Sequence, residues 1–553
     1  MQQRTPEVVI VGAGPGGLAA SMLLASAGAR VTLLERRQRV GGRTSTVEAP
    51  GGFRFDLGPT FFLYPQILRE IFAACGRSLD DEVELLRLDP HYRLAFEGRA
   101  DLRLGSSVEQ VRREIARLCP ADADGFESFL NDNRAKFEAF KPILQRPFNG
   151  LRDVLDLPLL QLLPLIRPLR SVERDLRRHF SDPRVRLAFS FQSKYLGMSP
   201  FQCPSLFTIL SFLEYEYGVY HPVGGCGAVS EAMAGVARDL GVDVRLDEEV
   251  RGIEFEGRRA VAVATRRGRI PCDALIVNAD FAAAMKRLVP DGLRRRWNDR
   301  QLDRKSYSCS TYMLYLGLDG EQGPPDHHTI FLAEDYEGNL ADIEQHHRLS
   351  ETPSFYVQNA TRTDRTMAAK GRTSLYVLAP VSHQHPNIDW RREAPSFRAR
   401  LLRQLEAVGV EDVERRIRFE KQITPADWEA DHRIHLGATF NLSHSLRQSL
   451  HLRPRNRFED LDGVYLVGGG THPGSGLPVI YESARIASRL AAEDLGLEAT
   501  WKPAAARLDD ERLVRTVRSF AADGAMRFPS AAGRRVASAP ESVGGDLREE
   551  EVA

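Results

Sequence analysis

Apolar residues near the start of the chain follow a pattern that predicts a strand, a helix and a second strand. Residues 8–11 (VVIV) form a short β-branched run that ends at a glycine, which is typical of a buried parallel strand. Residues 18–29 are rich in alanine and leucine and predict a helix, and residues 30–35 (RVTLLE) predict a strand that ends in an acid. This order of elements is typical of a parallel sheet, so we expect an α/β fold.

Three glycines lie between the first predicted strand and the helix, at Gly12, Gly14 and Gly17. In a dinucleotide-binding turn the first glycine allows a tight bend, the second lets the backbone approach a pyrophosphate, and the third lets helix and strand pack closely. The helix N-terminus offers free amides and the positive end of its dipole to the phosphates. Glu35 lies about 20 residues further on, where a carboxylate accepts hydrogen bonds from ribose hydroxyls. The pattern predicts a dinucleotide-binding site.

A second glycine pair, Gly41 and Gly42, is followed by Arg43 and separates the candidate dinucleotides. Residues 39–46 are similar to the motif that follows the second strand in glutathione-reductase-like flavoproteins, in particular the amine oxidases and carotenoid desaturases. Rossmann enzymes that bind only NAD usually lack this pair. A second pass of backbone near the pyrophosphate and ribityl chain suits a dinucleotide with a long flexible linker. We therefore expect FAD as the cofactor.

Three later segments also combine strands, glycine loops and helices. Residues 51–76 predict a strand and a loop at 58–60 that leads to a helix. Residues 217–255 predict a glycine turn, a helix and a strand that ends near Val250, where the backbone meets the adenine. Residues 463–495 predict a strand, a glycine loop and a helix. One nucleotide-binding unit assembled from distant parts of the chain accounts for all of them.

Together these stretches resemble the bacterial and fungal phytoene desaturases, a family of FAD-dependent carotenoid desaturases. The resemblance covers about residues 8–495. The matching stretches are 8–46, 53–60, 218–250, 374–390, 423–457 and 465–483. It is most specific near its C-terminal end, where Gly-Thr-His-Pro-Gly is followed by Gly-Leu-Pro. Residues 193–225 look closer to the diapophytoene desaturases, which act on C30 chains, than to the C40 enzymes.

The resemblance implies which residues bind FAD. They are Gly12, Gly14, Gly17, Glu35, Gly41, Gly42, Arg43, Val250, Gly469, Thr471 and Pro478. Many related flavoproteins place an acid after the last strand to bind the ribityl chain. Here residues 468–471 (GGGT) occupy that place, as in the desaturases, so backbone amides or the Thr471 hydroxyl must serve instead.

His472 is the candidate catalytic residue, because it lies in the loop expected beside the flavin. A titratable ring at that position would accept or relay a proton. The alternative is that the ring only holds the loop through hydrogen bonds.

We expect a Rossmann α/β domain of the glutathione-reductase type with an inserted α+β substrate domain, as in flavin amine oxidases. The flavin-contacting pieces lie at the beginning, middle and end of the chain, so the FAD domain is discontinuous. Its expected parts are 1–110, 218–290 and 455–498; the substrate domain comprises 111–217 and 291–454, with strands at 310–318 and 373–381; and 499–553 is a partly disordered tail with a short helix at 508–521.

Composition restricts the partners of the protein. Lysine plus arginine and aspartate plus glutamate number 75 each, and this zero net charge is unlike the basic surface of nucleic-acid-binding proteins. The six cysteines contain no CxxC pair and the histidines no HExxH motif, so we expect neither disulfides nor a metal site. A reduced cytoplasmic setting follows. The absence of a GxSxG motif also argues against a serine hydrolase.

An apolar stretch at 154–169 contains three prolines and leads into the arginine-rich residues 170–179. Prolines at that density forbid one regular helix, but an apolar surface flanked by arginines can lie in a bilayer interface, where a polyene dissolves. The alternative is an ordinary core segment. No apolar run reaches the ~18 residues of a membrane-spanning helix, and the chain enters its first strand without a signal peptide. We expect a cytoplasmic protein, peripheral on the inner face of the cell membrane.

These expectations describe an FAD-dependent oxidoreductase of carotenoid biosynthesis with an apolar polyene substrate. A hydride would pass from the isoprenoid chain to flavin N5 and a proton to a base or water, and a quinone or oxygen would then reoxidise the flavin. The alternatives are a flavin-dependent carotenoid oxidase or saturase, and a non-catalytic carrier of polyprenyl lipids. An oxidase of hydrophilic amines is disfavoured, because the sequence shows no evident aromatic cage or flavin-adjacent lysine.

Overall fold

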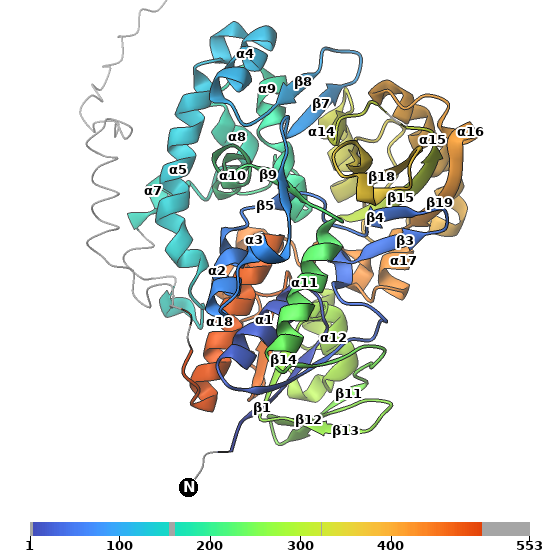
Figure 1. The fold of residues 1–553 in the computed structure, drawn as a ribbon. Coiled ribbons are helices and arrows are strands. Elements are labelled where there is room, and N and C mark those ends of the chain that lie inside the picture. Colours follow the sequence, from blue (N-terminus) through green and yellow to red (C-terminus); the bar gives the residue numbers. More distant parts are fainter. Residues whose placement is uncertain (1–3, 154–160, 322, 500, 502–553) are drawn as a thin grey trace, which may run out of the picture.

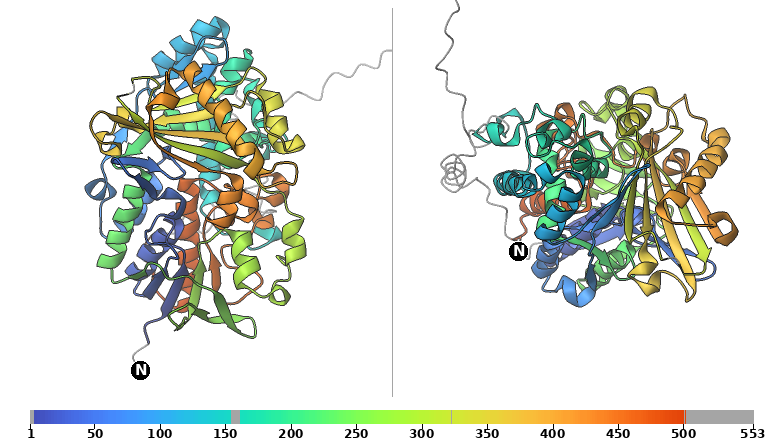
Figure 2. Two further views of the ribbon diagram at one scale, coloured as in Figure 1. Left: turned by 90° about the vertical axis from the view of Figure 1, so that its right-hand side faces the viewer. Right: turned by 90° about the horizontal axis from the view of Figure 1, so that it is seen from above.

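The computed structural model describes residues 4–153, 161–321, 323–499 and 501. Two halves are stacked, one built on a parallel five-stranded sheet and the other on a mixed seven-stranded sheet (Figure 1). The left view of Figure 2 shows the yellow strands of the second sheet above the blue strands of the first. The tail helix expected at 508–521 and part of the apolar stretch, 154–160, lie outside the described residues.

The parallel sheet is the base of the first half. Its strands lie in the order β10 (Asp243–Arg245), β2 (Arg30–Leu34), β1 (Glu7–Val11), β14 (Ala274–Val277) and β20 (Val464–Leu466). Val8 and Ile10 pack into one hydrophobic cluster and Val9 and Val11 into another, because successive side chains of a strand face opposite sides. Both faces are buried, which explains the uninterrupted apolar run at 8–11.

Helices cover one face of this sheet and a small antiparallel sheet covers the other (Figure 1). The main helices are α1 (Pro15–Ser26), α11 (Cys226–Asp239) and α18 (Leu477–Leu495), and the antiparallel strands are β11 (Gly252–Glu256), β12 (Arg259–Ala264) and β13 (Arg269–Pro271). The strands and helix expected over 8–35 are confirmed. The helix begins at Pro15, earlier than the pattern indicated, because proline is well suited to a first helical position.

Smaller elements complete the first half and connect it to the second half. They are β3 (Thr46–Ala49), β4 (Phe53–Asp56), β5 (Phe62–Leu63), α2 (Gln66–Ala74), α3 (Leu79–Glu82), β6 (Leu85–Arg87), β9 (Val219–Pro222), α12 (Phe281–Leu288) and α13 (Asp299–Asp303). The strand expected to end near Val250 is β10, which ends at Arg245. Val250 lies beyond it in the connection to β11.

The seven-stranded sheet carries the second half. Its strands lie in the order β19 (Ile417–Ile423), β15 (Ser310–Asp319), β18 (Arg372–Val381), β17 (Phe355–Asn359), β16 (His328–Leu332), β7 (Tyr92–Phe96) and β8 (Leu102–Leu104). The strands expected at 310–318 and 373–381 are confirmed as β15 and β18, which pair antiparallel from Ser310 opposite Val381 to Asp319 opposite Arg372.

The chain enters the second half earlier than the expected boundary at residue 110. β7 runs parallel to β16 with Arg93 opposite Thr329, so residues 92–104 belong to the seven-stranded sheet. The sequence near β7 does not reveal this, because the partner of a strand is set by tertiary contacts rather than by local propensity.

The two faces of the second sheet have different partners. Leu314 of β15, Val377 of β18 and their same-face neighbours pack against α15 (Trp390–Leu405). The alternate positions Met313, Tyr356 and Tyr376 face the first half. The strict alternation therefore presents one row of side chains to the space between the halves.

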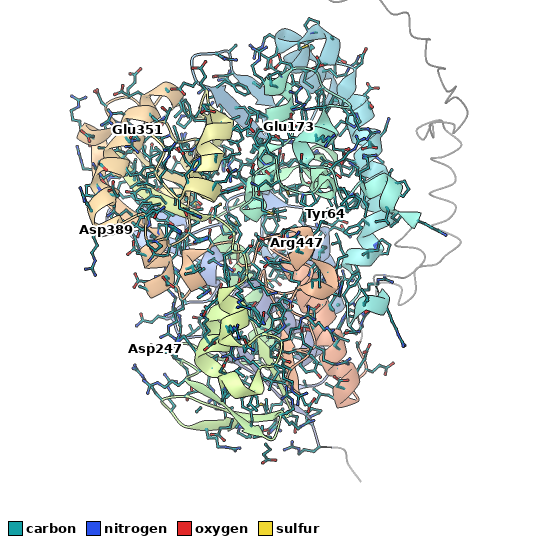
Figure 3. All side chains as sticks on the ribbon, turned by 180° about the vertical axis from the view of Figure 1, so that it is seen from behind. Tyr64, Glu173, Asp247, Glu351, Asp389 and Arg447 are labelled. Atoms are coloured by element: carbon teal, nitrogen blue, oxygen red, sulfur yellow. The ribbon has the colours of Figure 1, made fainter. Side chains whose placement is uncertain are left out.

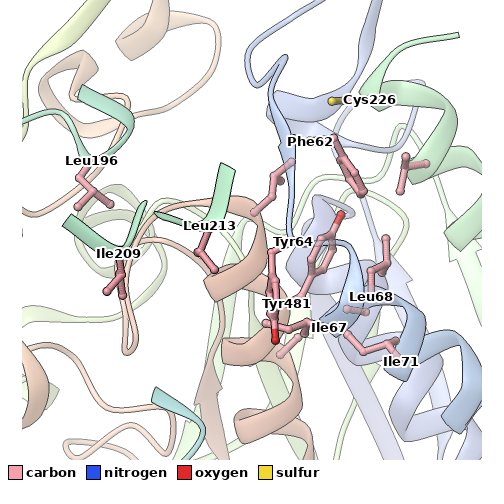
Figure 4. Packing of buried hydrophobic residues seen from close by; sticks show 14 of the residues in the cluster. Phe62, Tyr64, Ile67, Leu68, Ile71, Leu196, Ile209, Leu213, Cys226 and Tyr481 are labelled. Carbon is pink, nitrogen blue, oxygen red and sulfur yellow. The ribbon is translucent and has the colours of Figure 1, made fainter. Parts of the chain in front are cut away.

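Helices close this space from the side. They are α4 (Val108–Leu118), α5 (Gly125–Leu144), α7 (Leu163–Ile166), α8 (Val172–Leu176), α9 (Pro183–Ala188), the 3₁₀ helix η4 (Phe191–Leu196) and α10 (Ile209–Tyr217); α14 (Tyr336–Ala341), α16 (Val413–Arg416) and α17 (Pro425–Ala430) flank the second sheet. Figure 4 shows Leu196, Ile209 and Leu213 of this layer on one side and Tyr64 and Ile67 on the other. No helix in the described ranges is long and apolar enough to cross a membrane.

Candidate functional site

One cavity of about 860 Å³ runs from the carboxyl edge of the parallel sheet to the inner face of the seven-stranded sheet. The loops that follow β1, β2, β14 and β20 line its first part, and apolar and aromatic side chains line the rest. Parallel strands end at a common edge, so loops from the start, middle and end of the chain converge there. This is the position in which open α/β sheets bind ligands.

Asn278, the residue after β14, holds the first glycine loop against the sheet. Its amide donates to the Val11 carbonyl at 2.9 Å, and its Nδ2 donates to the Gly12 carbonyl at 3.0 Å. A Cβ on Gly12 would lie 2.6 Å from the Asn278 carbonyl oxygen, and one on Gly17 would lie 2.1 Å from the Gly12 carbonyl oxygen. Neither position has room for a side chain. Gly12 and Gly14 border the cavity and leave space for a pyrophosphate, whereas Gly17 lies behind them.

Glu35 is buried at the end of β2 and borders the cavity. One carboxylate oxygen accepts from the Ala13 amide and the other from the Arg37 amide, both at 2.9 Å. These bonds fix the carboxylate in place, but each oxygen has a second lone pair. The group therefore keeps the capacity to accept hydrogen bonds from ribose hydroxyls.

The second glycine pair packs directly on the first loop. Gly41 and Gly42 have φ values of 97° and 54°, which favour glycine, and a Cβ on Gly42 would lie 3.4 Å from Gly14 Cα. The Gly41 amide donates to the Ala13 carbonyl at 2.8 Å. Gly42 borders the cavity and Gly41 lies behind it. The structure thus brings together the two glycine clusters that the sequence separates.

Arg43 and Asp280 place opposite charges on the cavity wall. Arg43 donates to the Thr439 carbonyl. Desolvation lowers the pKa of Arg43, and the charge of Asp280 only partly offsets this. Asp280 accepts from the Ala283 amide at 3.0 Å as the N-cap of α12, and burial raises the pKa of this carboxyl to about 6. Asp280 was not expected from the sequence, because an aspartate before a predicted helix is a common N-cap and does not by itself indicate a binding site.

Glycine backbone lines the cavity directly after β20, at Gly468 and Gly469. Gly469 and Pro478 border the cavity, and a Cβ on Gly469 would lie 2.6 Å from the Ser475 hydroxyl oxygen. Thr471 is buried behind this loop and its hydroxyl donates to the Pro454 carbonyl. Of the two alternatives for the missing acid, the backbone is the one that this geometry favours.

Arg453 holds the loop after β20 in place through hydrogen bonds to its backbone. Its guanidinium is buried and donates to five carbonyl oxygens, those of Gly469 (2.7 Å), Leu442 (3.1 Å), Thr471 (3.2 Å), Ser443 (3.2 Å) and Gln448 (3.3 Å). Burial lowers its pKa to about 9. Within the described ranges it forms no ion pair, so the carbonyl dipoles alone hold the charge. No pattern in the sequence distinguishes this arginine from the many others.

His472 borders the cavity, as expected, but its environment disfavours proton transfer. Burial lowers the pKa of the ring to about 3, so the imidazole is neutral and a weak base at neutral pH. The ring meets Phe148 edge-on, with centroids 5.1 Å apart. A catalytic role for His472 stays a prediction. The alternative, in which the ring holds its loop through hydrogen bonds, also stays a prediction, because both ring nitrogens are buried without a hydrogen-bond partner among the described residues.

Val250 is buried at the cavity wall, at the end where Glu35 lies. The neighbouring Glu248 amide donates to the Glu35 carbonyl at 2.8 Å. This connection brings the backbone after β10 alongside the end of β2, where the sequence placed the adenine. Among the described residues, no group of three or more His, Cys, Asp and Glu side chains is arranged to hold a metal ion.

Two tyrosines at the centre of the cavity join the two halves. The Tyr356 hydroxyl lies 2.8 Å from the Thr60 hydroxyl, and Tyr376 donates to the Gly58 carbonyl at 2.8 Å. Beyond them the wall is largely apolar and includes Phe61, Leu206, Leu210, Leu213, Ile330, Leu340 and Ile343. The cavity therefore changes from a glycine-lined to a hydrocarbon-like environment near residues 58–61.

A glycine cradle at the carboxyl edge of a parallel sheet, continuous with a largely apolar chamber, is typical of a nucleotide-dependent oxidoreductase. Comparisons with known proteins agree. The model of the family described as "Flavin containing amine oxidoreductase" matches residues 15–492, and the chain belongs to this family. The expected fold class is thereby confirmed.

The chain is also similar to individual carotenoid enzymes. It is 43% identical to a 4,4'-diapophytoene desaturase (4,4'-diapolycopene-forming) of a Methylomonas species, over 88% of this chain and 96% of the relative. It is 38% identical to an all-trans-zeta-carotene desaturase of Myxococcus xanthus, over 88% and 94%. Among solved structures, an oxidoreductase from Methanosarcina mazei shares the fold with a TM-score of 0.57 at 16% identity, covering 87% of this chain and 99% of that one.

We predict that Glu35→Gln weakens FAD binding by about 10- to 100-fold. Both carboxylate oxygens accept from backbone amides, so an amide NH2 there faces a donor and costs roughly 1–3 kcal/mol. Titration of the apoprotein with FAD measures the effect. Glu254→Gln, an exposed position on β11, is the control and should bind FAD as the wild type does. Equal affinity of both variants would contradict the role given to Glu35.

We predict that Arg453→Met lowers the free energy of unfolding by about 3 kcal/mol, because five buried carbonyl oxygens lose their donor. Denaturant unfolding measures this loss. Arg457→Met removes a half-exposed ion pair with Asp494 and should cost about 0–1 kcal/mol. A similar small loss in both variants would show that Arg453 does not hold the loop.

Proposed function

We propose that this protein is an FAD-dependent desaturase of carotenoid precursors. The observation that carries the proposal is the continuity of one cavity, which has dinucleotide-type glycine loops at one end and an apolar wall at the other. An isoprenoid hydrocarbon has no polar group by which to be held, so a long apolar wall is what aligns it. The names of the similar proteins, which are desaturases of carotenoids and their precursors, support the same conclusion.

The cofactor is FAD. Gly12 and Gly14 would approach the pyrophosphate, Glu35 would accept from the ribose, and Val250 would lie against the adenine. Residues from both ends of the chain would hold the flavin side, namely Gly42, Arg43, Gly469 and Pro478. When bound, FAD supplies the hydride acceptor, its N5 atom, for removal of hydrogen from a saturated carbon. The protein aligns the chain and excludes water, and a quinone or oxygen then takes the electrons.

The substrate proposed is the C30 precursor diapophytoene. The identity to the Methylomonas enzyme, 43%, exceeds the 36% identity to a lycopene-forming phytoene desaturase of Pseudescherichia vulneris. The resemblance of residues 193–225 to the diapophytoene enzymes supports the same choice, since these residues include Leu196, Ile209 and Leu213 of the cavity wall.

We predict that cells supplying the colourless C30 precursor form a long-wavelength polyene when they express this protein. The visible spectrum of the extracted lipids is the measurement, and cells supplying the C40 precursor are the parallel experiment. A band only in the C40 strain would overturn the chain length but keep the reaction. No band in either strain, with folded protein and bound FAD, would point to an oxidase or saturase, or to a carrier that leaves absorbance unchanged.

We also propose that the protein docks on the inner face of the cell membrane around the cavity mouth. Leu163, Leu169 and Leu446 are exposed there, Leu169 to 90%. A second hollow of about 710 Å³ beside them is lined by Arg170, Arg174, Arg177 and Arg447. Arg170, Arg174 and Arg447 form no ion pair within the described ranges, whereas Arg177 pairs with Glu173 at 3.0 Å. Arg447 and Glu173 are labelled in Figure 3. Exposed leucines and unpaired arginines together suit an anionic bilayer surface.

We predict that the protein floats with vesicles of phosphatidylglycerol and phosphatidylcholine, and that the Leu163→Ser, Leu169→Ser, Leu446→Ser variant binds them at least 10-fold more weakly. Each buried leucine contributes roughly 1.5–3 kcal/mol. Val108→Ser changes an exposed apolar residue on α4 and should leave binding unchanged. Equal binding by all three proteins would exclude this docking face.

A further inference from the structure

We propose that Tyr195 and Glu214 form the proton-accepting pair of the reaction, with Tyr195 at the cavity wall and Glu214 directly behind it. The inference rests on the proposed desaturase function and assigns the base that His472 is poorly suited to be. It follows from a buried cluster on η4, α10 and β7.

Glu214 is a fully buried carboxyl that only neutral groups contact. The Tyr195 hydroxyl donates to Oε1 at 2.9 Å, and the Tyr92 hydroxyl (3.0 Å) and the Gln192 amide (2.9 Å) donate to Oε2. The Tyr92 hydroxyl lies a further 2.8 Å from that of Tyr215. The cluster thus forms a hydrogen-bonded chain that leads from the cavity into the protein.

Tyr195 lies where the glycine-lined part of the cavity passes into the apolar part. Its ring centroid is 5.2 Å from that of Phe61, the residue after the 58–60 loop, and Tyr195 borders the cavity. A Cβ on Gly58 would lie 2.8 Å from the Arg43 carbonyl oxygen, so this loop touches the second glycine segment. Tyr195 therefore borders the passage between the apolar part of the cavity and the glycine-lined part proposed for the cofactor.

The electrostatics of the cluster suit a base at neutral pH. Burial raises the pKa of Glu214 to about 7, although its three donors lower it. Burial, reinforced by Glu214, holds the Tyr195 pKa well above 10, so Tyr195 remains a donor. The titratable groups that face Glu214 are Tyr92 and Tyr195, with Tyr215 beyond Tyr92 and His91 beside the Tyr215 ring; no charged side chain in the described ranges contacts it. By contrast, the His472 pKa is about 3.

The step balances without a further reactant. One C–H electron pair of the substrate leaves with its hydrogen to the cofactor. The neighbouring carbon loses a proton to the Tyr195 oxygen as the Tyr195 proton passes to Glu214 Oε1, and the electron pair of that second C–H bond becomes the new C=C bond. Tyr195 is the catalytic residue and Glu214 acts through it. Glu214 must be ionised before each catalytic cycle, so the turnover rate increases as the pH is raised through the Glu214 pKa.

The test compares the FAD-loaded wild type with Glu214→Gln, Tyr195→Phe and the control Tyr312→Phe. Tyr312 is also a buried tyrosine bonded to one side chain, Gln422, but it lies on the opposite face of the second sheet. Anaerobic flavin bleaching by the precursor is followed from pH 5.5 to 8.5, and an infrared carboxyl band is titrated in the absence of substrate. FAD content is measured for every variant.

We expect the wild-type rate to rise with an apparent pKa near 7, in step with loss of the carboxyl band. Glu214→Gln should lack that band, lose the pH dependence and slow bleaching by about 10²- to 10⁴-fold. Tyr195→Phe should be as slow but keep the band, and Tyr312→Phe should match the wild type. Wild-type rate and pH profile in Glu214→Gln would overturn the pair and leave the desaturase intact. Failure of the wild type to desaturate either precursor would instead overturn the proposed function.

Discussion

Backbone packed on backbone at the first glycine loop is the constraint on which the rest of the structure depends. The backbones at Gly12, Gly17 and Asn278 pack so closely that neither glycine has room for a Cβ atom. The contact ties the beginning of the chain to the end of β14, and β20 brings the C-terminal segment alongside β14 with Ile276 opposite Tyr465. The parallel sheet therefore positions the glycine loops at the nucleotide end of the cavity, and residues 439–453 hold two of its segments from the other side, through Thr439 and Arg453.

Tyrosine hydroxyls then set the second half on the first. Tyr315, Tyr356 and Tyr376 come from β15, β17 and β18, and all three bond to the short segment 57–60 beside the glycine loops. Because the same strands bury their alternate residues against α15, the sheet cannot shift by one position without exposing its core face. The apolar wall is thus held in register with the nucleotide site by a few directional bonds and a strict alternation.

Sequence patterns predicted the parts of this arrangement whose requirements are local. Gly12 and Gly42 are recognisable because a tight turn and a close approach need glycine within a few residues, and residues 8–11 because a strand buried on both faces is apolar throughout. The roles of Asn278, Arg453 and Glu214 were not predicted, because they depend on partners that are distant in the sequence. The placement of β7 was not predicted for the same reason, and the burial that weakens His472 as a base arises from residues distant in the sequence, such as Phe148.

The early crossing of the chain at β7 and β8 has a mechanical consequence. Residues 92–104 extend a sheet whose other strands come after residue 309, while the residues before them in the chain belong to the nucleotide half. The chain therefore passes between the two halves several times, so they are not joined at a single hinge. Because the chain crosses between the halves more than once, a wide separation of the halves would break strand pairing, and a long apolar substrate would instead have to enter the cavity by one end.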